Sequence, residues 1–240
     1  MKTIVKFVAI PIMMLGFAGC TTYPNKITPE TRQVVKTVSI FNTVYAPSEI
    51  HAELGKAIGV DALTGALIEA AGNTYKTKSF NSKLHSQLNP TEFLSQTLLS
   101  TFKAKLASCT LFTLTTNEIA DASFVLEVSR AGLGQPKAWP LPGWGTMPPE
   151  VEVVVTLISK PPFDLKEVNL MGGPFGIKPV DPTLHKILYQ KVVYLRGGDG
   201  LFTGSGLPYY KKDEYLSKEV FEKAFGQAIS TAVDKITDDW

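Results

Sequence analysis

The stretch VEVVVTLIS, residues 151–159, is nearly continuous in β-branched and other apolar residues. β-Branched side chains favour strands, and a strand that is apolar on both faces is typical of the interior of a sheet. Pro161 and Pro162 follow the stretch and end it. We therefore expect residues 151–159 to form a central strand around which the rest of the fold is arranged.

Further strands are predicted on both sides of this segment. The sequence SFVLEVSR, residues 123–130, alternates: Phe124, Leu126 and Val128 share one face, and Glu127 and Ser129 share the other. Similar β-rich patterns predict strands at 34–44, 109–115 and 187–195, of which the first is followed by Pro47 and the last by Gly197 and Gly198.

Helices are predicted before and after these strands. Asn89 can cap a helix with Pro90 at its first position, and apolar residues then recur every four positions to about residue 107. The segment 213–238 shows an amphipathic helical pattern. Weaker signals predict a helix near Glu49 and a Gly/Ala-rich helix over 55–72, which the more polar residues 73–88 continue or follow.

The order of these elements is strand, helices, several strands, helix. Hairpin-like connections between the middle strands favour an α+β fold, with a mixed or antiparallel sheet of about five strands and helices packed mainly on one face. The length of the chain suits a single domain over residues 34–240.

The first 20 residues have the layout of a secretory signal. Lys2 and Lys6 precede the uncharged apolar run 7–17, which is too short to span a bilayer, and two small residues then precede Cys20. A secreted protein in which Cys20 is incidental is the simpler alternative.

The sequence Phe17-Ala18-Gly19-Cys20 resembles the lipobox of bacterial lipoproteins, with Phe17 where that family usually has leucine. The resemblance implies cleavage before Cys20 and acylation of its sulfur and amine. Residues 1–19 are then a signal peptide and 20–33 a lipidated, polar tether between membrane and domain. Thr21, in place of an aspartate, implies the outer membrane and a periplasmic domain.

The charge of the chain excludes some classes of partner. The 24 basic and 22 acidic residues become 22 of each once the signal removes Lys2 and Lys6. A neutral mature protein has no general attraction to nucleic acid or anionic lipid.

No catalytic, metal or cofactor motif is present. The histidines His51, His85 and His185 are isolated, and neither an esterase serine motif nor a phosphate loop occurs. Carboxylates such as Asp121 and Glu127 have no sequence signature. A lone Cys109 is expected to be buried and inert. We therefore expect no enzyme and no cofactor, although active sites also assemble from distant residues.

The most informative loop is GQPKAWPLPGWGTMPP, residues 134–149. Its prolines exclude a regular element, and its large apolar side chains are of the kind enriched at protein interfaces. The candidate contact residues are Trp139, Leu141, Trp144 and Met147. The tryptophans could equally fold back over an end of the sheet. A second loop of similar character, 161–182, is expected at the opposite end of the sheet.

The lipobox, the Gly/Ala-rich helix and ADASFVLEVSRAGLG, residues 120–134, together resemble the curli secretion lipoprotein and the N-terminal domain of the Tol translocation protein. The resemblance implies a non-enzymatic role in the cell envelope, through binding or assembly with an envelope protein. The alternatives are a lipid-binding or transport-accessory lipoprotein, with an apolar cleft beneath the 55–72 helix, and a cell-wall hydrolase.

Overall fold

The computed structural model describes residues 23–52, 77–116, 119–134, 145–159, 186–195, 207–238 and 240. The predicted helix over 55–72 and the loop 161–182 lie outside the described residues.

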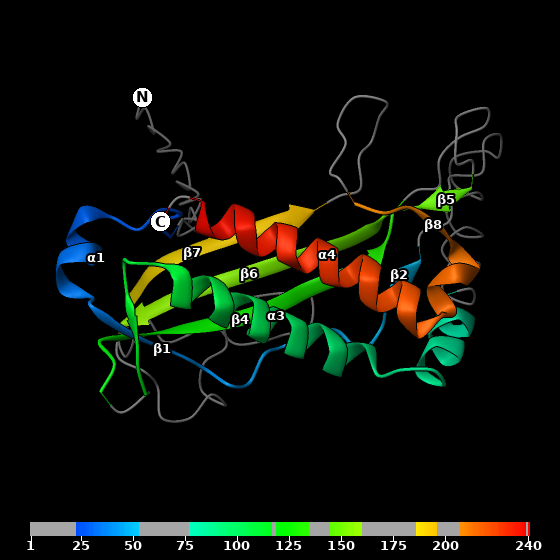
Figure 1. Ribbon diagram of the computed structural model, residues 1–240, viewed down its shortest axis with the longest axis horizontal. Helices are drawn as coiled ribbons and strands as arrows, with labels where there is room; N and C mark the ends of the chain where they lie inside the picture. Colours follow the sequence, from blue (N-terminus) through cyan, green and yellow to red (C-terminus); the bar gives the residue numbers. More distant parts are fainter. Residues whose placement is uncertain are drawn as a thin grey trace, which may run out of the picture.

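A mixed six-stranded sheet forms one layer of the molecule (Figure 1). Its order is β3 (Thr113–Leu114), β1 (Thr37–Ile40), β4 (Ala122–Leu133), β6 (Pro149–Ser159) and β7 (Lys186–Leu195), and β2 (His51–Ala52) also pairs with β4. β6 runs antiparallel to both of its neighbours, whereas β1 and β2 lie parallel to β4. The α+β class and the central position of 151–159 are confirmed.

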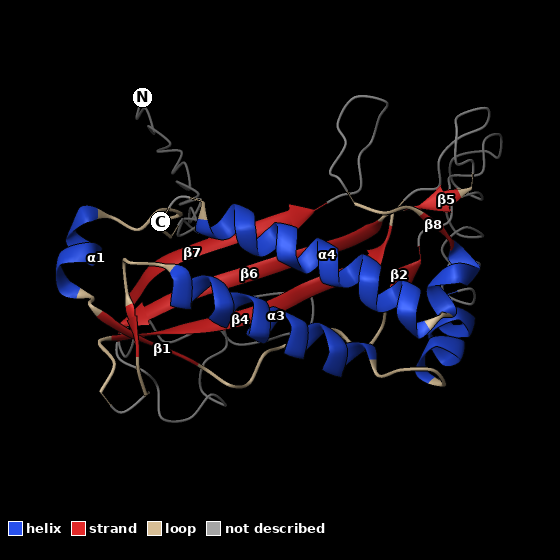
Figure 2. Ribbon diagram, in the orientation of Figure 1, coloured by secondary structure: helices blue, strands red, loops and turns tan. Residues whose placement is uncertain are grey.

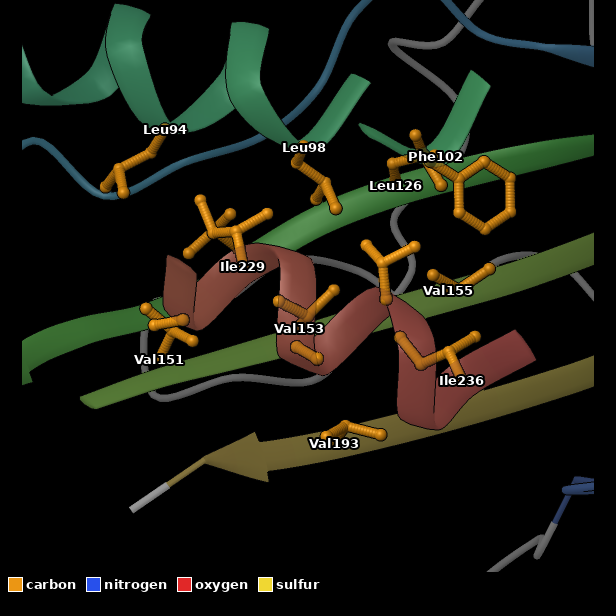
Figure 3. Close-up of a cluster of buried hydrophobic side chains, with 14 of the residues drawn as sticks. Leu94, Leu98, Phe102, Leu126, Val151, Val153, Val155, Val193, Ile229 and Ile236 are labelled. Carbon is orange, nitrogen blue, oxygen red and sulfur yellow. The ribbon is translucent and has the colours of Figure 1, made fainter. Parts of the chain in front are cut away.

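Two long helices, α3 (Pro90–Ser108) and α4 (Lys218–Thr237), lie side by side across one face of this sheet (Figure 2). Asn89 caps α3 as expected, since its side chain accepts a hydrogen bond from the backbone N–H of Glu92 at 3.3 Å. The helices press their apolar stripes onto the strands (Figure 3), and the side chains of the two stripes are all buried: Leu94, Leu98, Phe102, Leu106, Phe221, Phe225, Ile229 and Ala232.

The C-terminal segment is divided, rather than one helix over 213–238. The short 3-10 helix η2 (Lys212–Leu216) comes first, and α4 begins after Ser217. Beyond α4, the ring of Trp240 stacks on that of Phe124 with centroids 5.4 Å apart. The end of the chain therefore closes the core between the helices and the sheet.

The first strand is shorter than predicted. Thr28 accepts a hydrogen bond from the backbone N–H of Thr31 at 3.2 Å and so caps a short helix, α1 (Pro29–Val34). The strand β1 begins only at Thr37, and β3 is reduced to two residues.

The prediction of a helix near Glu49 is wrong, because residues 48–50 are not helical and β2 begins at His51. The side chain of Asn81 accepts a hydrogen bond from the N–H of Ile50 at 2.8 Å and donates one to its carbonyl at 3.0 Å. These bonds fix the backbone just before β2, which then pairs with β4. Asn81 itself belongs to a helical stretch, residues 77–85, within the polar segment 73–88.

The described part of the predicted tether is packed on the domain instead of extending from it. Ile27 is only 4% exposed and belongs to the core. The carbonyl of Pro24 accepts a hydrogen bond from the backbone N–H of Gln190, on β7, at 2.9 Å. Polar composition suggested a tether, but one apolar side chain and an available strand N–H suffice to hold this segment on the fold.

Within the described residues, none of the helices combines the length and apolar character that crossing a bilayer requires.

Candidate functional site

The loop 134–149 is clamped at both of its ends. Residues 135–144, which include Trp139, Leu141 and Trp144, lie outside the described residues. The N–H of Gly134 donates to the carbonyl of Pro148 at 2.9 Å. The short strand β5 (Thr146–Met147) pairs with β8 (Tyr210–Lys211). The ten-residue segment thus leaves and re-enters the fold at one place, which we name the loop base.

Met147 is part of the core and not a contact residue. It is 4% exposed and packs with the main apolar cluster. Its carbonyl accepts a 2.7 Å hydrogen bond from the hydroxyl of the fully buried Tyr215, and burial raises the pKa of that hydroxyl. The sequence showed an apolar residue in a proline-rich loop, but only the fold shows that it points inward.

A buried carboxyl group supports the loop base from β6. Glu150 is 3% exposed and accepts a 2.8 Å hydrogen bond from the hydroxyl of Tyr194 on β7. A Cβ on Gly134 would lie 2.6 Å from Oε1 of Glu150 and 2.9 Å from Pro148 Cγ. Glycine is therefore favoured where the loop leaves β4, because a side chain would have to displace the buried carboxyl group of Glu150 or the Pro148 ring.

The face of the sheet opposite the helices carries a second polar group. Ser129 donates a 2.5 Å hydrogen bond to Oε1 of Glu152 on the neighbouring strand. Burial, and secondarily the negative charge of Glu152, raise the pKa of Glu127. A carboxyl group that keeps its proton to higher pH is suited to general acid catalysis.

Sequence reasoning did not bring Glu127 and Glu152 together, because their proximity depends on strand register. Alternation places Glu127 on the face away from Phe124, but it does not identify which residues of β6 lie beside it. The register pairs Glu127 with Val154 and Arg130 with Glu152, with an irregularity between Val128 and Arg130.

Asp121 has a structural role. Its carboxylate accepts hydrogen bonds from the backbone N–H groups of Lys36 and Thr37 at 2.9 and 2.8 Å, and from the Thr37 hydroxyl at 2.9 Å. These bonds, the one from the Thr37 N–H first, hold the pKa of Asp121 below its usual value. Asp121 therefore ties the start of β4 to β1.

The remaining candidates are dispersed. His51 lies in β2, and His85 contacts the carbonyl of Ser48 at 2.9 Å, whereas His185 is outside the described residues. Across the described residues, no three His, Cys, Asp or Glu side chains are grouped to hold a metal ion. Cys109 caps the end of α3 and is half-buried instead of fully buried.

Comparisons with known proteins give one structural resemblance. No family model matches the chain, and no curated protein matches it in sequence. Among solved structures, the hypothetical protein CT253 from Chlamydia trachomatis aligns over 85% of this chain and 94% of its own, at 11% identity and a TM-score of 0.35.

Proposed function

We propose that this protein is a bacterial envelope lipoprotein, anchored through Cys20 in the outer membrane, whose periplasmic domain binds another envelope protein without catalysing a reaction. The contact is made by the segment 135–144, through Trp139, Leu141 and Trp144. The proposal extends the resemblance to the curli and Tol proteins to the role of this chain.

The observation that carries the proposal is the loop base. The Gly134–Pro148 hydrogen bond, the pairing of β5 with β8 and the Tyr215–Met147 hydrogen bond hold both ends of a tryptophan- and proline-rich segment. Fixed ends and prolines lower the entropy lost on binding, and tryptophan is enriched among residues that dominate binding energy. A lipid anchor also raises the effective concentration for neighbours in the same membrane.

Crosslinking in intact cells tests the proposal. A photoreactive residue replaces Trp144, and a matched control replaces Ala104, which is exposed on α3. The proposal expects one envelope protein to be captured from position 144 and not from position 104. Capture of the same proteins from both positions, or of none, would contradict it, and co-purifying phospholipid would instead favour the lipid-binding alternative.

The lipid anchor is tested separately. Cys20→Ser should abolish incorporation of radiolabelled palmitate and release the protein from the membrane fraction. Thr21→Ser is the matched control and should leave both unchanged, since it preserves a small polar residue after the cysteine. Normal acylation of the Cys20→Ser chain would show that Cys20 is not the acylated residue.

A hydrolase is the second candidate, and it is favoured by two carboxyl groups on adjacent strands, those of Glu127 on β4 and Glu152 on β6, the first of which has a raised pKa. A cell-wall hydrolase would release soluble fragments from purified peptidoglycan, and Glu127→Gln would abolish that release. Asp121→Asn is the control, because Asp121 serves the backbone of β1. Equal activity in the wild type and Glu127→Gln would remove this candidate.

A further inference from the structure

The point where the chain becomes fixed to the domain lies only four residues after Cys20. Pro24 is held by the N–H of Gln190, and Ile27 is buried in the core. The capped helix α1 and the buried Val35 continue the packed segment. The chain between Cys20 and Pro24 spans at most about 14 Å when fully extended.

This attachment point lies at one end of the long axis. Tyr189 donates from its hydroxyl to the carbonyl of Ile236 at 3.3 Å, and Lys191 donates from Nζ to that of Lys235 at 2.7 Å. Gln190, between them, is therefore beside the last turn of α4. We name this region, with α1, the anchor end, and Figure 1 shows α1 and the C-terminus together there.

The loop base lies at the other end of the same helix. η2 directly precedes α4, and Tyr215 of η2 contacts Met147. Figure 1 shows β5 and β8 at the end opposite α1. The 20 residues of α4 separate the two ends by about 30 Å at 1.5 Å per residue.

We infer that the bilayer carrying the Cys20 lipid is itself a contact partner of the domain: the anchor end is held against the lipid headgroups, and the loop base is directed away from the membrane. The inference rests on the proposed acylation of Cys20. Because the chain from Cys20 to Pro24 is at most about 14 Å long, the anchor end stays within that distance of the acylated cysteine. The loop base then faces the periplasm, where a partner can reach it, and the domain does not stand off on a flexible tether.

Fluorescence quenching on the lipidated full-length protein in phospholipid vesicles tests this arrangement. Two variants are prepared, each with a single fluorophore, one at Val34→Cys and the other at Lys218→Cys. Both carry Cys109→Ser so that no other thiol reacts. Both positions are open to labelling, since Val34 is 75% exposed and the Lys218 side chain 65% exposed. The vesicles contain lipid with a nitroxide on its headgroup, which quenches only at close range.

We expect loss of fluorescence at position 34 and none at position 218. A linker of 15 Gly/Ser residues inserted between Thr22 and Tyr23 adds a mean reach of roughly 20 Å, and should abolish the loss at position 34. Equal quenching at both positions, or quenching at 34 that persists with the linker, would overturn the inference.

Vesicle flotation separates this failure from failure of the proposed function. Protein that floats with the vesicles but is quenched equally at both positions is acylated and anchored, so only the orientation is wrong. Protein that does not float, and whose N-terminal peptide has no acyl mass, lacks the anchor, and both the proposed function and this inference then fail.

Discussion

Replacing Trp240 by alanine should destabilise the domain strongly, although this residue lies beyond the last helix. Its ring stacks on Phe124 and makes edge contacts with Phe102, Phe112 and Tyr189, at centroid distances of 5.6, 6.1 and 6.4 Å. Truncating a buried tryptophan to alanine costs about 3–5 kcal/mol. Because Trp240 is half-buried, we expect a loss of about 2–3 kcal/mol in the free energy of unfolding.

Trp240→Phe separates the ring from its N–H group. Nε1 of Trp240 is buried and has no hydrogen-bond partner among the described residues, so removing it loses no bond. We expect this variant to lose less than about 1.5 kcal/mol. Urea unfolding followed by far-UV circular dichroism measures both variants, in a chain with Cys20→Ser and without the signal segment. Equal losses in the two variants, or a loss below about 0.5 kcal/mol in Trp240→Ala, would refute the packing argument.

Three further predictions use the same unfolding measurement. Gly226→Ala should stabilise the protein by about 0.5–1 kcal/mol, because alanine favours the middle of α4 and the new Cβ meets only Phe93 Cζ, at 3.8 Å; a lower urea midpoint would contradict this. Tyr215→Phe should cost about 1–3 kcal/mol, because it leaves the buried carbonyl of Met147 without its 2.7 Å donor, and a loss near zero would show that the loop base does not depend on this bond. Glu127→Gln should become more stable relative to the wild type as the pH rises above 4.5, the ordinary pKa of glutamate. The reason is that ionisation of a carboxyl group with a raised folded-state pKa destabilises the fold. If the difference in unfolding free energy between the two proteins is the same at pH 4 and pH 8, the carboxyl group of Glu127 is not perturbed.

The candidate site was partly visible in the sequence. The tryptophans and prolines of 134–149 predicted a binding loop, but they did not show which of its residues face the core. Met147 is apolar like Leu141, but it is 4% exposed and belongs to the core cluster that also contains Tyr215, 68 positions further along the chain. The neighbouring carboxyl groups of Glu127 and Glu152 depend in the same way on strand register, which no local pattern specifies.

The sequence by itself determined the elements whose pattern repeats locally. The apolar stripes of α3 and α4 and the β-branched run of β6 carry their own periodicity and capping signals, so their positions and buried faces follow from neighbours within a few residues. It also contains the stretch Phe17–Cys20, whose resemblance to a lipobox is the basis of the proposed anchor.

Only the tertiary structure decided the features that depend on partners distant in the chain. β2 exists because Asn81 fixes Ile50 and β4 offers an edge for pairing. The segment before α1 is fixed because the backbone N–H of Gln190 donates a hydrogen bond to the carbonyl of Pro24, and this part of the predicted tether is therefore held on the domain. Short segments with weak local preferences take the structure that their long-range hydrogen bonds and buried contacts stabilise, because those contacts outweigh propensities of a few tenths of a kcal/mol.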